Sequence, residues 1–186
     1  MKLWTIRTTE EWDILQREGV LRTDVALSDW HLRRRAYVWM SRQLKERVGA
    51  PPAGVVLPIW VWRYWAGTAR ARPDLRCGTM LPRGTLGVRL ELDLPPESVL
   101  LSNFDAWHAV LNDHYHALDD ADYEWFEQLA ESGQLSAAQL TQIKEDSWQR
   151  IFDLSLIPNP STWAVQGVVW EVPLASVQKV DYFKAR

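Results

Sequence analysis

The sequence has few of the features that mark secreted or membrane-bound proteins. Cys77 is its single cysteine, so the chain cannot form an internal disulfide, and its first residues lack the apolar core of a secretory leader. The longest apolar run, residues 55–62, contains Pro58 and falls well short of the roughly 20 residues that a membrane-spanning helix needs. These features predict a cytoplasmic protein with no membrane segment.

Basic charge and nucleotide-binding motifs are also scarce. The formal net charge is −3 and the pI is about 5.8. Affinity for phosphates comes mostly from Lys and Arg, so a strongly basic nucleic-acid binder is excluded and only local basic patches remain. No Walker, GxGxxG or GxSxG pattern occurs, and the glycines of residues 78–87 lack those spacings. The enzyme classes that carry these motifs are therefore not expected.

The length and apolar content predict one domain spanning residues 1–186. Hydrophobic residues make up 47% of the chain, which is enough for a core without disulfides or metals. Residues 2–7 are expected to form a strand. Thr8 and Glu11 have the spacing of a capping box that opens a helix, and Gly19 is placed to end it.

The remaining pattern predicts an α+β fold, with strands near both ends of the chain and helices between them. A loop is expected at residues 66–85, which are rich in Gly, Pro and Arg. The expected helices are residues 28–48, 103–112, 120–132 and 136–151, and the expected further strands are residues 55–65, 87–94, 163–174 and 179–183.

Tryptophan is unusually abundant, with 12 in the chain and three within residues 60–65. Alternation along a strand would place Trp60, Trp62 and Tyr64 on one face and Val61, Arg63 and Trp65 on the other. Such an aromatic face can stack on a base or a nicotinamide ring. The same rings can equally form ordinary core. Both interpretations stay open, and the first makes Trp60, Trp62 and Tyr64 ligand-binding residues.

A histidine-rich segment raises the question of a metal site. His108, His114 and His116 lie among several aspartates. No Cys pair, HExxH or EF-hand spacing accompanies them, and Asp119 and Asp120 are equally explained as the start of a helix. No metal ligand is assigned, and a metal-dependent hydrolase is retained only as an alternative.

The loop at residues 66–85 contains four arginines that admit two interpretations. Guanidinium groups suit bidentate contacts with phosphate, so the loop could hold a phosphorylated ligand. An ordinary solvated loop explains the same residues. The arginines are Arg70, Arg72, Arg76 and Arg83.

Four segments resemble a bacterial family. They are LWTIRT at residues 3–8, WHxxLN at 107–112, SWxxIFD at 147–153 and VDYFKAR at 180–186. Together they are similar to the domain-of-unknown-function family numbered 3841, over essentially the whole chain. That family has no assigned activity, so the resemblance implies a bacterial or phage origin but no chemistry.

Two regions also resemble ADP-ribosyltransferase-like domains. The opening strand and helix, with Arg7 near the strand's end, are similar to the start of those domains, where an Arg or His contacts NAD. Residues 166–174 resemble the region that carries the catalytic glutamate in nucleic-acid-modifying members. The resemblance implies an antiparallel sheet core of ADP-ribosyltransferase-like type with flanking helices, NAD as a substrate, Arg7 as an NAD-binding residue and Glu171 as the catalytic residue. The middle motif of that family has no clear match, and Trp60, Trp62 and Tyr64 would take its stacking role.

The implied function is an NAD-dependent ADP-ribosyltransferase-like enzyme of the toxin or phage-defence type, acting on a nucleic acid or a protein. One alternative is a non-catalytic module that binds a nucleotide or a peptide. A purely structural alternative exists for the two charged residues as well, because Arg7 and Glu171 could form an exposed cross-strand ion pair.

Overall fold

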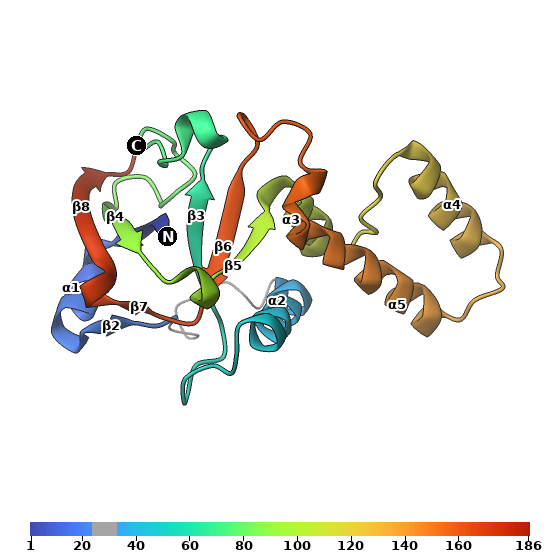
Figure 1. Ribbon diagram of the computed structural model, residues 1–186, viewed down its shortest axis with the longest axis horizontal. Helices are drawn as coiled ribbons and strands as arrows, with labels where there is room; N and C mark the ends of the chain where they lie inside the picture. The colour runs from blue at the N-terminus through green and yellow to red at the C-terminus, as the bar shows by residue number, and fades with distance from the viewer. Residues whose placement is uncertain (24–32) are drawn as a thin grey trace.

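The computed structural model describes residues 1–23 and 33–186, and in this part of the chain it is a mixed structure with one large antiparallel sheet (Figure 1). The strands of that sheet are β1 (Lys2–Thr8), β3 (Ile59–Tyr64), β4 (Leu86–Asp93), β5 (Leu100–Asn103), β6 (Val165–Val169) and β8 (Val177–Lys184). They are ordered β5-β6-β3-β1-β4-β8, and each neighbouring pair is antiparallel. The predicted α+β class with an antiparallel sheet is confirmed.

A second, two-stranded sheet and a set of helices complete the described structure. The small sheet pairs β2 (Val20–Leu21) with β7 (Val172–Pro173). The helices are α1 (Thr9–Glu18), α2 (Arg34–Arg47), α3 (Phe104–Leu111), α4 (Asp120–Glu131) and α5 (Ala137–Ser147). In Figure 1, α4 and α5 extend away from the large sheet. No helix within the described residues is long and apolar enough to cross a membrane.

The entry into α1 follows directly from local sequence. The Thr8 hydroxyl accepts a hydrogen bond from the backbone N–H of Glu11, and the Glu11 carboxylate accepts one from the backbone N–H of Thr8. Gly19 ends the helix with a φ of 74°, a left-handed conformation that glycine adopts without steric cost. The predicted capping box and helix end are confirmed, and they fix the position of Glu11 relative to the end of β1.

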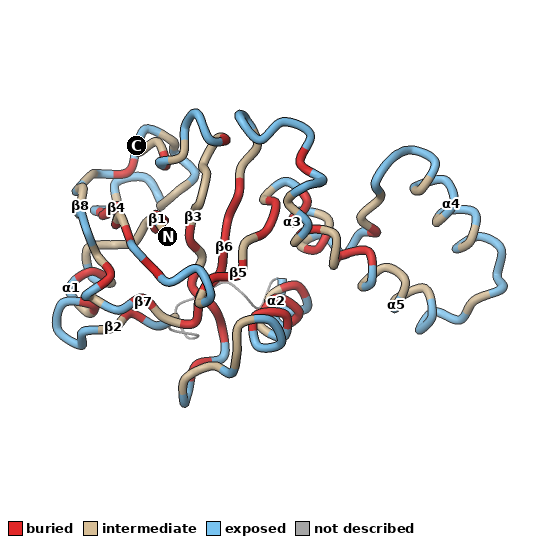
Figure 2. Tube along the Cα trace, viewed as in Figure 1, coloured by how far each residue is buried: buried red, intermediate tan, exposed pale blue. Residues whose placement is uncertain are grey.

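Two apolar cores lie on opposite faces of the large sheet. Because side chains alternate along a strand, Val168 packs in one core and Val169 in the other. The first core joins the sheet to α1 through Trp12 and Leu15, whereas the second joins it to α2 and α3. Figure 2 shows the buried parts of β3 and β6 running between these layers. Burial of this kind is the main source of the fold's stability.

Several predicted boundaries need correction. The predicted strand at residues 55–65 begins only at Ile59, after Pro58, which has no backbone N–H for a sheet. The single strand predicted at residues 163–174 is wrong. β6 ends at Val169, the chain bends at Trp170, and β7 joins the other sheet, so Glu171 lies between two strands.

Two short strands were not predicted, and one predicted helix start cannot be compared. β2 and β5 are too short to show a clear alternation, so no pattern in the sequence indicates them. The expected start of the second helix at Ser28 lies outside the described residues. Within them, α2 buries Met40 and Leu44 and leaves its first arginines exposed.

The large sheet is incompletely joined at its centre. β1 pairs with β4 along its whole length, but its backbone pairing with β3 is confined to Trp4 and Trp62. Side chains bridge the rest of the junction. The Thr5 hydroxyl donates to the carbonyl of Trp60 at 3.0 Å, and Arg63 donates to the carbonyl of Lys2 at 2.8 Å. Side chains therefore satisfy these backbone carbonyls, which the ladder leaves unpaired. β1 and β3 can diverge here without leaving them unsatisfied.

One buried ion pair ties β4 to the edge strand β8. Arg89 is only 6% exposed, and its Nη2 donates to Asp181 Oδ2 at 2.5 Å while its Nη1 donates to the carbonyl of Pro73 at 2.6 Å. We predict that Asp181→Asn lowers the free energy of unfolding by about 2 kcal/mol, because it leaves a buried guanidinium without its counter-charge. Urea denaturation measures this. Lys179→Ala removes only an exposed partner of Asp181 and should change stability by about 0.5 kcal/mol or less.

The same pair gives a pH dependence. The hydrogen bond from Arg89 holds the pKa of Asp181 below its ordinary value. The stabilisation is therefore fully present above the pKa of aspartate in the unfolded chain, and it is lost as the pH falls through the lower pKa of the folded state. The stability difference between wild type and Asp181→Asn should persist from pH 7 to about 5 and shrink below about pH 4. A difference that stays constant down to pH 3 would contradict this assignment.

Candidate functional site

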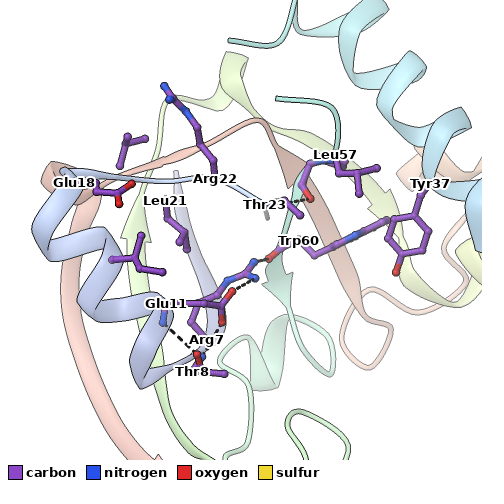
Figure 3. Close-up of a pocket in the computed structure, with 13 residues that line it drawn as sticks. Arg7, Thr8, Glu11, Glu18, Leu21, Arg22, Thr23, Tyr37, Leu57 and Trp60 are labelled. Atoms are coloured by element: carbon purple, nitrogen blue, oxygen red, sulfur yellow. Dashed lines mark hydrogen bonds and ion pairs between the residues drawn. The ribbon is translucent and has the colours of Figure 1, made fainter. Parts of the chain in front are cut away.

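A pocket of about 650 Å³ opens where β1 and β3 separate (Figure 3). Its walls come from the end of β1, helix α1, the residues that follow β2, helix α2 and the start of β3. The volume lies in the range typical of small-ligand sites. The lining residues are Arg7, Thr8, Glu11, Ile14, Glu18, Val20, Leu21, Arg22, Thr23, Tyr37, Leu57, Pro58 and Trp60.

Arg7 is held at one end of this pocket by hydrogen bonds. Its guanidinium donates to the Thr5 hydroxyl at 3.1 Å, to Glu11 Oε1 at 3.3 Å and to the carbonyl of Trp60 at 3.4 Å. Its side chain is 18% exposed, so the positive charge is largely sheltered but still borders the pocket. Figure 3 shows Arg7 and Glu11 meeting beside Thr8. The predicted ligand-binding residue Arg7 therefore lines the pocket, and it also braces the split between β1 and β3.

Glu11 lines the pocket, although its spacing from Thr8 predicted only a role in helix capping. One carboxylate oxygen accepts from the backbone N–H of Thr8 at 2.9 Å, and the other faces Arg7. The capping box thus positions a carboxylate within the pocket. The signal was present in the sequence, because a capping box placed directly after a strand brings its N3 side chain back toward the end of that strand.

Arg22 and Glu171, which flank the paired strands β2 and β7, form an ion pair at the pocket's other end. Arg22 directly follows β2 and Glu171 directly precedes β7, and the pairing of Leu21 with Val172 brings these two neighbours close together. The Nε and Nη2 atoms of Arg22 donate to Glu171 Oε2 at 3.1 and 2.9 Å. Arg22 lines the pocket, and Glu171 is bound to it without being a lining residue.

The structural alternative for the two predicted charged residues, an ion pair between Arg7 and Glu171, is wrong. Glu171 is paired with Arg22 and not with Arg7. Arg7 instead pairs with Glu11 on the following helix. In Figure 3, Arg7 and Arg22 lie at opposite ends of the pocket. Arg7 therefore lines the pocket, whereas Glu171 does not and contacts only its lining residue Arg22.

Of the three aromatic residues predicted to bind a ligand, Trp60 lines the pocket. Its ring meets that of Tyr37 edge to face, with centroids 6.0 Å apart, and packs on Trp107 at 4.9 Å. Tyr37, on α2, was not predicted as a site residue. Burial raises the pKa of the Tyr37 hydroxyl, so this group stays protonated at neutral pH. The pocket therefore has two aromatic side chains beside its charged groups.

Trp62 and Tyr64 lie outside this pocket. Trp62 packs on Phe104 at 4.9 Å and on Trp65 at 4.6 Å, and Tyr64 lies beneath the guanidinium of Arg63. The predicted separation of Trp65 from Trp62 on opposite faces is wrong. The register of β3 with β6 shifts after Trp62, and such a bulge interrupts the alternation of side chains. Contacts with Phe104 and Trp65 thus account for the position of Trp62.

The three histidines considered for a metal site have separate environments. The ring of His108 lies near the carbonyl of Phe104, the carbonyl of His114 accepts from the indole of Trp148, and burial lowers the pKa of His116. Among the residues that the structure describes, no group of three or more His, Cys, Asp or Glu side chains could hold a metal ion.

Comparison with known proteins places the chain in a family. The model of the domain of unknown function DUF3841 matches residues 2–178. The chain belongs to this family. No curated protein and no solved structure matches the sequence. Family membership therefore confirms the predicted kinship, and the family description assigns no activity.

The exposure of the Arg22–Glu171 pair predicts that it contributes little to stability. The side chains are 47% and 34% exposed, and ion pairs in such positions are worth about 1 kcal/mol at most. Glu171→Gln and Arg22→Gln should each change the free energy of unfolding by less than about 1 kcal/mol in urea denaturation. A loss of 3 kcal/mol or more in either variant would show that the pair is a structural element of the β2–β7 sheet.

Proposed function

We propose that this DUF3841 protein is an NAD-dependent ADP-ribosyltransferase-like enzyme that binds NAD in the pocket between β1 and β3. The observation that carries the proposal is the composition of that pocket. It combines two arginines, Arg7 and Arg22, with the aromatic rings of Trp60 and Tyr37. The carboxylate of Glu171, just outside the lining, is bound to Arg22. A dinucleotide needs the same set of groups, since it carries phosphates and planar rings.

Each residue has a role that follows from its chemistry. The guanidinium of Arg7 suits the pyrophosphate, because its planar donors match phosphate oxygens. Trp60 and Tyr37 offer apolar surface to an adenine or nicotinamide ring. Glu171 is the candidate catalytic residue, and Arg22 is a positioning residue that orients its carboxylate.

The reaction would break the glycosidic bond between nicotinamide and the ribose of NAD. Nicotinamide leaves with the bonding electron pair, and an oxygen or nitrogen of the acceptor forms the new bond to the ribose carbon. The acceptor loses its proton to the carboxylate or to water. A carboxylate beside the ribose stabilises the positive charge that develops as the bond breaks, which lowers the barrier. The acceptor class, a nucleic acid or a protein, stays a prediction.

Labelled NAD incubated with the protein and a mixture of nucleic acids and lysate proteins tests the proposal. Wild-type protein should release nicotinamide and label an acceptor. Glu171→Gln should lower that rate by about 100-fold or more while NAD binding, measured by calorimetry, is kept. Glu97→Gln is the matched control, because it removes an exposed carboxylate outside the pocket. Absence of both NAD binding and nicotinamide release in the wild type would refute the proposal.

A second candidate, a non-catalytic nucleotide-binding module, is favoured by the ion pairs themselves. Arg7 is engaged by Thr5, Glu11 and Trp60, and Glu171 by Arg22, so both predicted residues already have structural partners. This candidate predicts NAD or mononucleotide binding without nicotinamide release, and the same affinity in Glu171→Gln. Arg7→Lys keeps the charge and loses the planar fork, so it should weaken binding under either candidate.

A further inference from the structure

A second concavity, of about 830 Å³, lies at the other end of the β1–β3 junction. The first pocket involves the end of β1 and the start of β3, whereas this one involves Trp4 near the start of β1 and Trp65 just after β3. The loop that follows β3 forms its rim. Its charged and aromatic lining includes Trp65, Arg70, Arg72, Asp74, Arg76 and Arg89.

The lining has an excess of positive charge. Arg89 is neutralised by Asp181, and Arg76 is neutralised by Asp74, with contacts of 2.9 Å from Nε to Oδ1 and 2.6 Å from Nη2 to Oδ2. Within residues 1–23 and 33–186, the side chains of Arg70 and Arg72 make no hydrogen bond or ion pair. A chain with a net charge of −3 thus gathers in one concavity two guanidinium groups that have no hydrogen-bonded carboxylate. Arg70 interacts with Asp74 only through longer-range electrostatic attraction.

Backbone contacts hold the loop that carries these two arginines. The N–H of Trp65 donates to the carbonyl of Ala71 at 2.9 Å, which closes the loop on itself. The buried guanidinium of Arg89 anchors the carbonyl of Pro73 to the face of the sheet. Arg70 and Arg72 therefore extend from an ordered backbone. This reduces the conformational entropy that the loop would lose on binding a ligand.

Gly67 fixes the base of the same loop. Its φ of 75° favours glycine, and a Cβ there would lie 2.1 Å from the backbone of Ser161. The neighbouring N–H of Thr68 donates to the carbonyl of Pro160 at 3.0 Å. The loop is thus packed closely against a second segment, and this is unlike a freely solvated arginine-rich loop.

Trp65 adds an aromatic wall to the concavity. Its ring meets Trp62 nearly perpendicularly, at a centroid distance of 4.6 Å, and the residue is partly exposed. A partly exposed indole beside unpaired guanidinium groups matches the way proteins bind single strands, where bases stack on aromatic rings and basic groups contact the backbone. A duplex would not supply this stacking, because its bases are already stacked on one another.

We infer that this concavity binds single-stranded nucleic acid, with Arg70 and Arg72 contacting phosphates and Trp65 stacking on a base. The site is separate from the pocket between β1 and β3 and does not depend on any reaction with NAD. Its occupant carries both a phosphate and an exposed base face.

Fluorescence anisotropy of a labelled single-stranded oligonucleotide, without NAD, tests the inference. The double variant Arg70→Gln/Arg72→Gln should weaken binding and lower the slope of log affinity against log salt by about 1.4, since each phosphate contact on a single strand contributes about 0.7. The matched control is Arg83→Gln/Lys45→Gln, which removes the same charge from exposed residues outside the concavity and should leave the slope unchanged.

Trp65→Leu separates stacking from charge. It should weaken binding about 5-fold or more without changing the salt slope, since stacking of a base is lost and the phosphate contacts stay. Thermal unfolding of each variant verifies that the loop is intact.

Three results would overturn the inference. The first is equal affinity of the Arg70→Gln/Arg72→Gln variant and its charge-matched control. The second is binding of a duplex as tightly as the single strand. The third is displacement of the strand by micromolar mononucleotide or inorganic phosphate, which would make the free anion the ligand.

Discussion

The carbonyl oxygen of Trp60 joins two halves of a sheet that the backbone ladder leaves apart. It accepts hydrogen bonds from the Thr5 hydroxyl and from the guanidinium of Arg7, where regular pairing of β1 with β3 would otherwise continue. Arg7 can reach it because the capping box fixes Glu11 on its other side. The polar groups exposed by the split are thus satisfied, so the sheet can hold a pocket at its centre without a large energetic cost.

Strand β3 links the two concavities of the molecule. Trp60, near its start, lines the pocket that contains Arg7 and Arg22, and Trp65, just past its end, lines the concavity that contains the loop arginines. The bulge after Trp62 turns Trp65 toward the ring of Trp62 instead of the opposite face. The tryptophans therefore have two structural roles, since some rings pack in the core and others line the two concavities.

The parts of the structure that depend on neighbouring residues were predictable, and those that depend on distant contacts were not. Thr8 and Glu11 predict the start of α1, because a capping box depends only on residues three positions apart. The bulge that redirects Trp65 depends on pairing with β6, which no local pattern reveals. Arg22 was not predicted as a site residue for a related reason. β2 is too short to show periodicity, and Glu171, the partner of Arg22, lies far along the chain. In the candidate site, the sequence pointed to Arg7 and Glu171 as residues of interest but did not reveal their partners Glu11 and Arg22.

Hydrogen exchange of the whole protein, followed by mass spectrometry with and without NAD, tests most directly whether the split between β1 and β3 is a ligand site. Ligand in this pocket restricts the opening of the segments that line it. The account predicts slower exchange at residues 5–8, 20–23 and 57–60, and unchanged exchange where β4 pairs with β8. Unchanged exchange in all three segments at saturating NAD, or slower exchange confined to other parts of the chain, would contradict it.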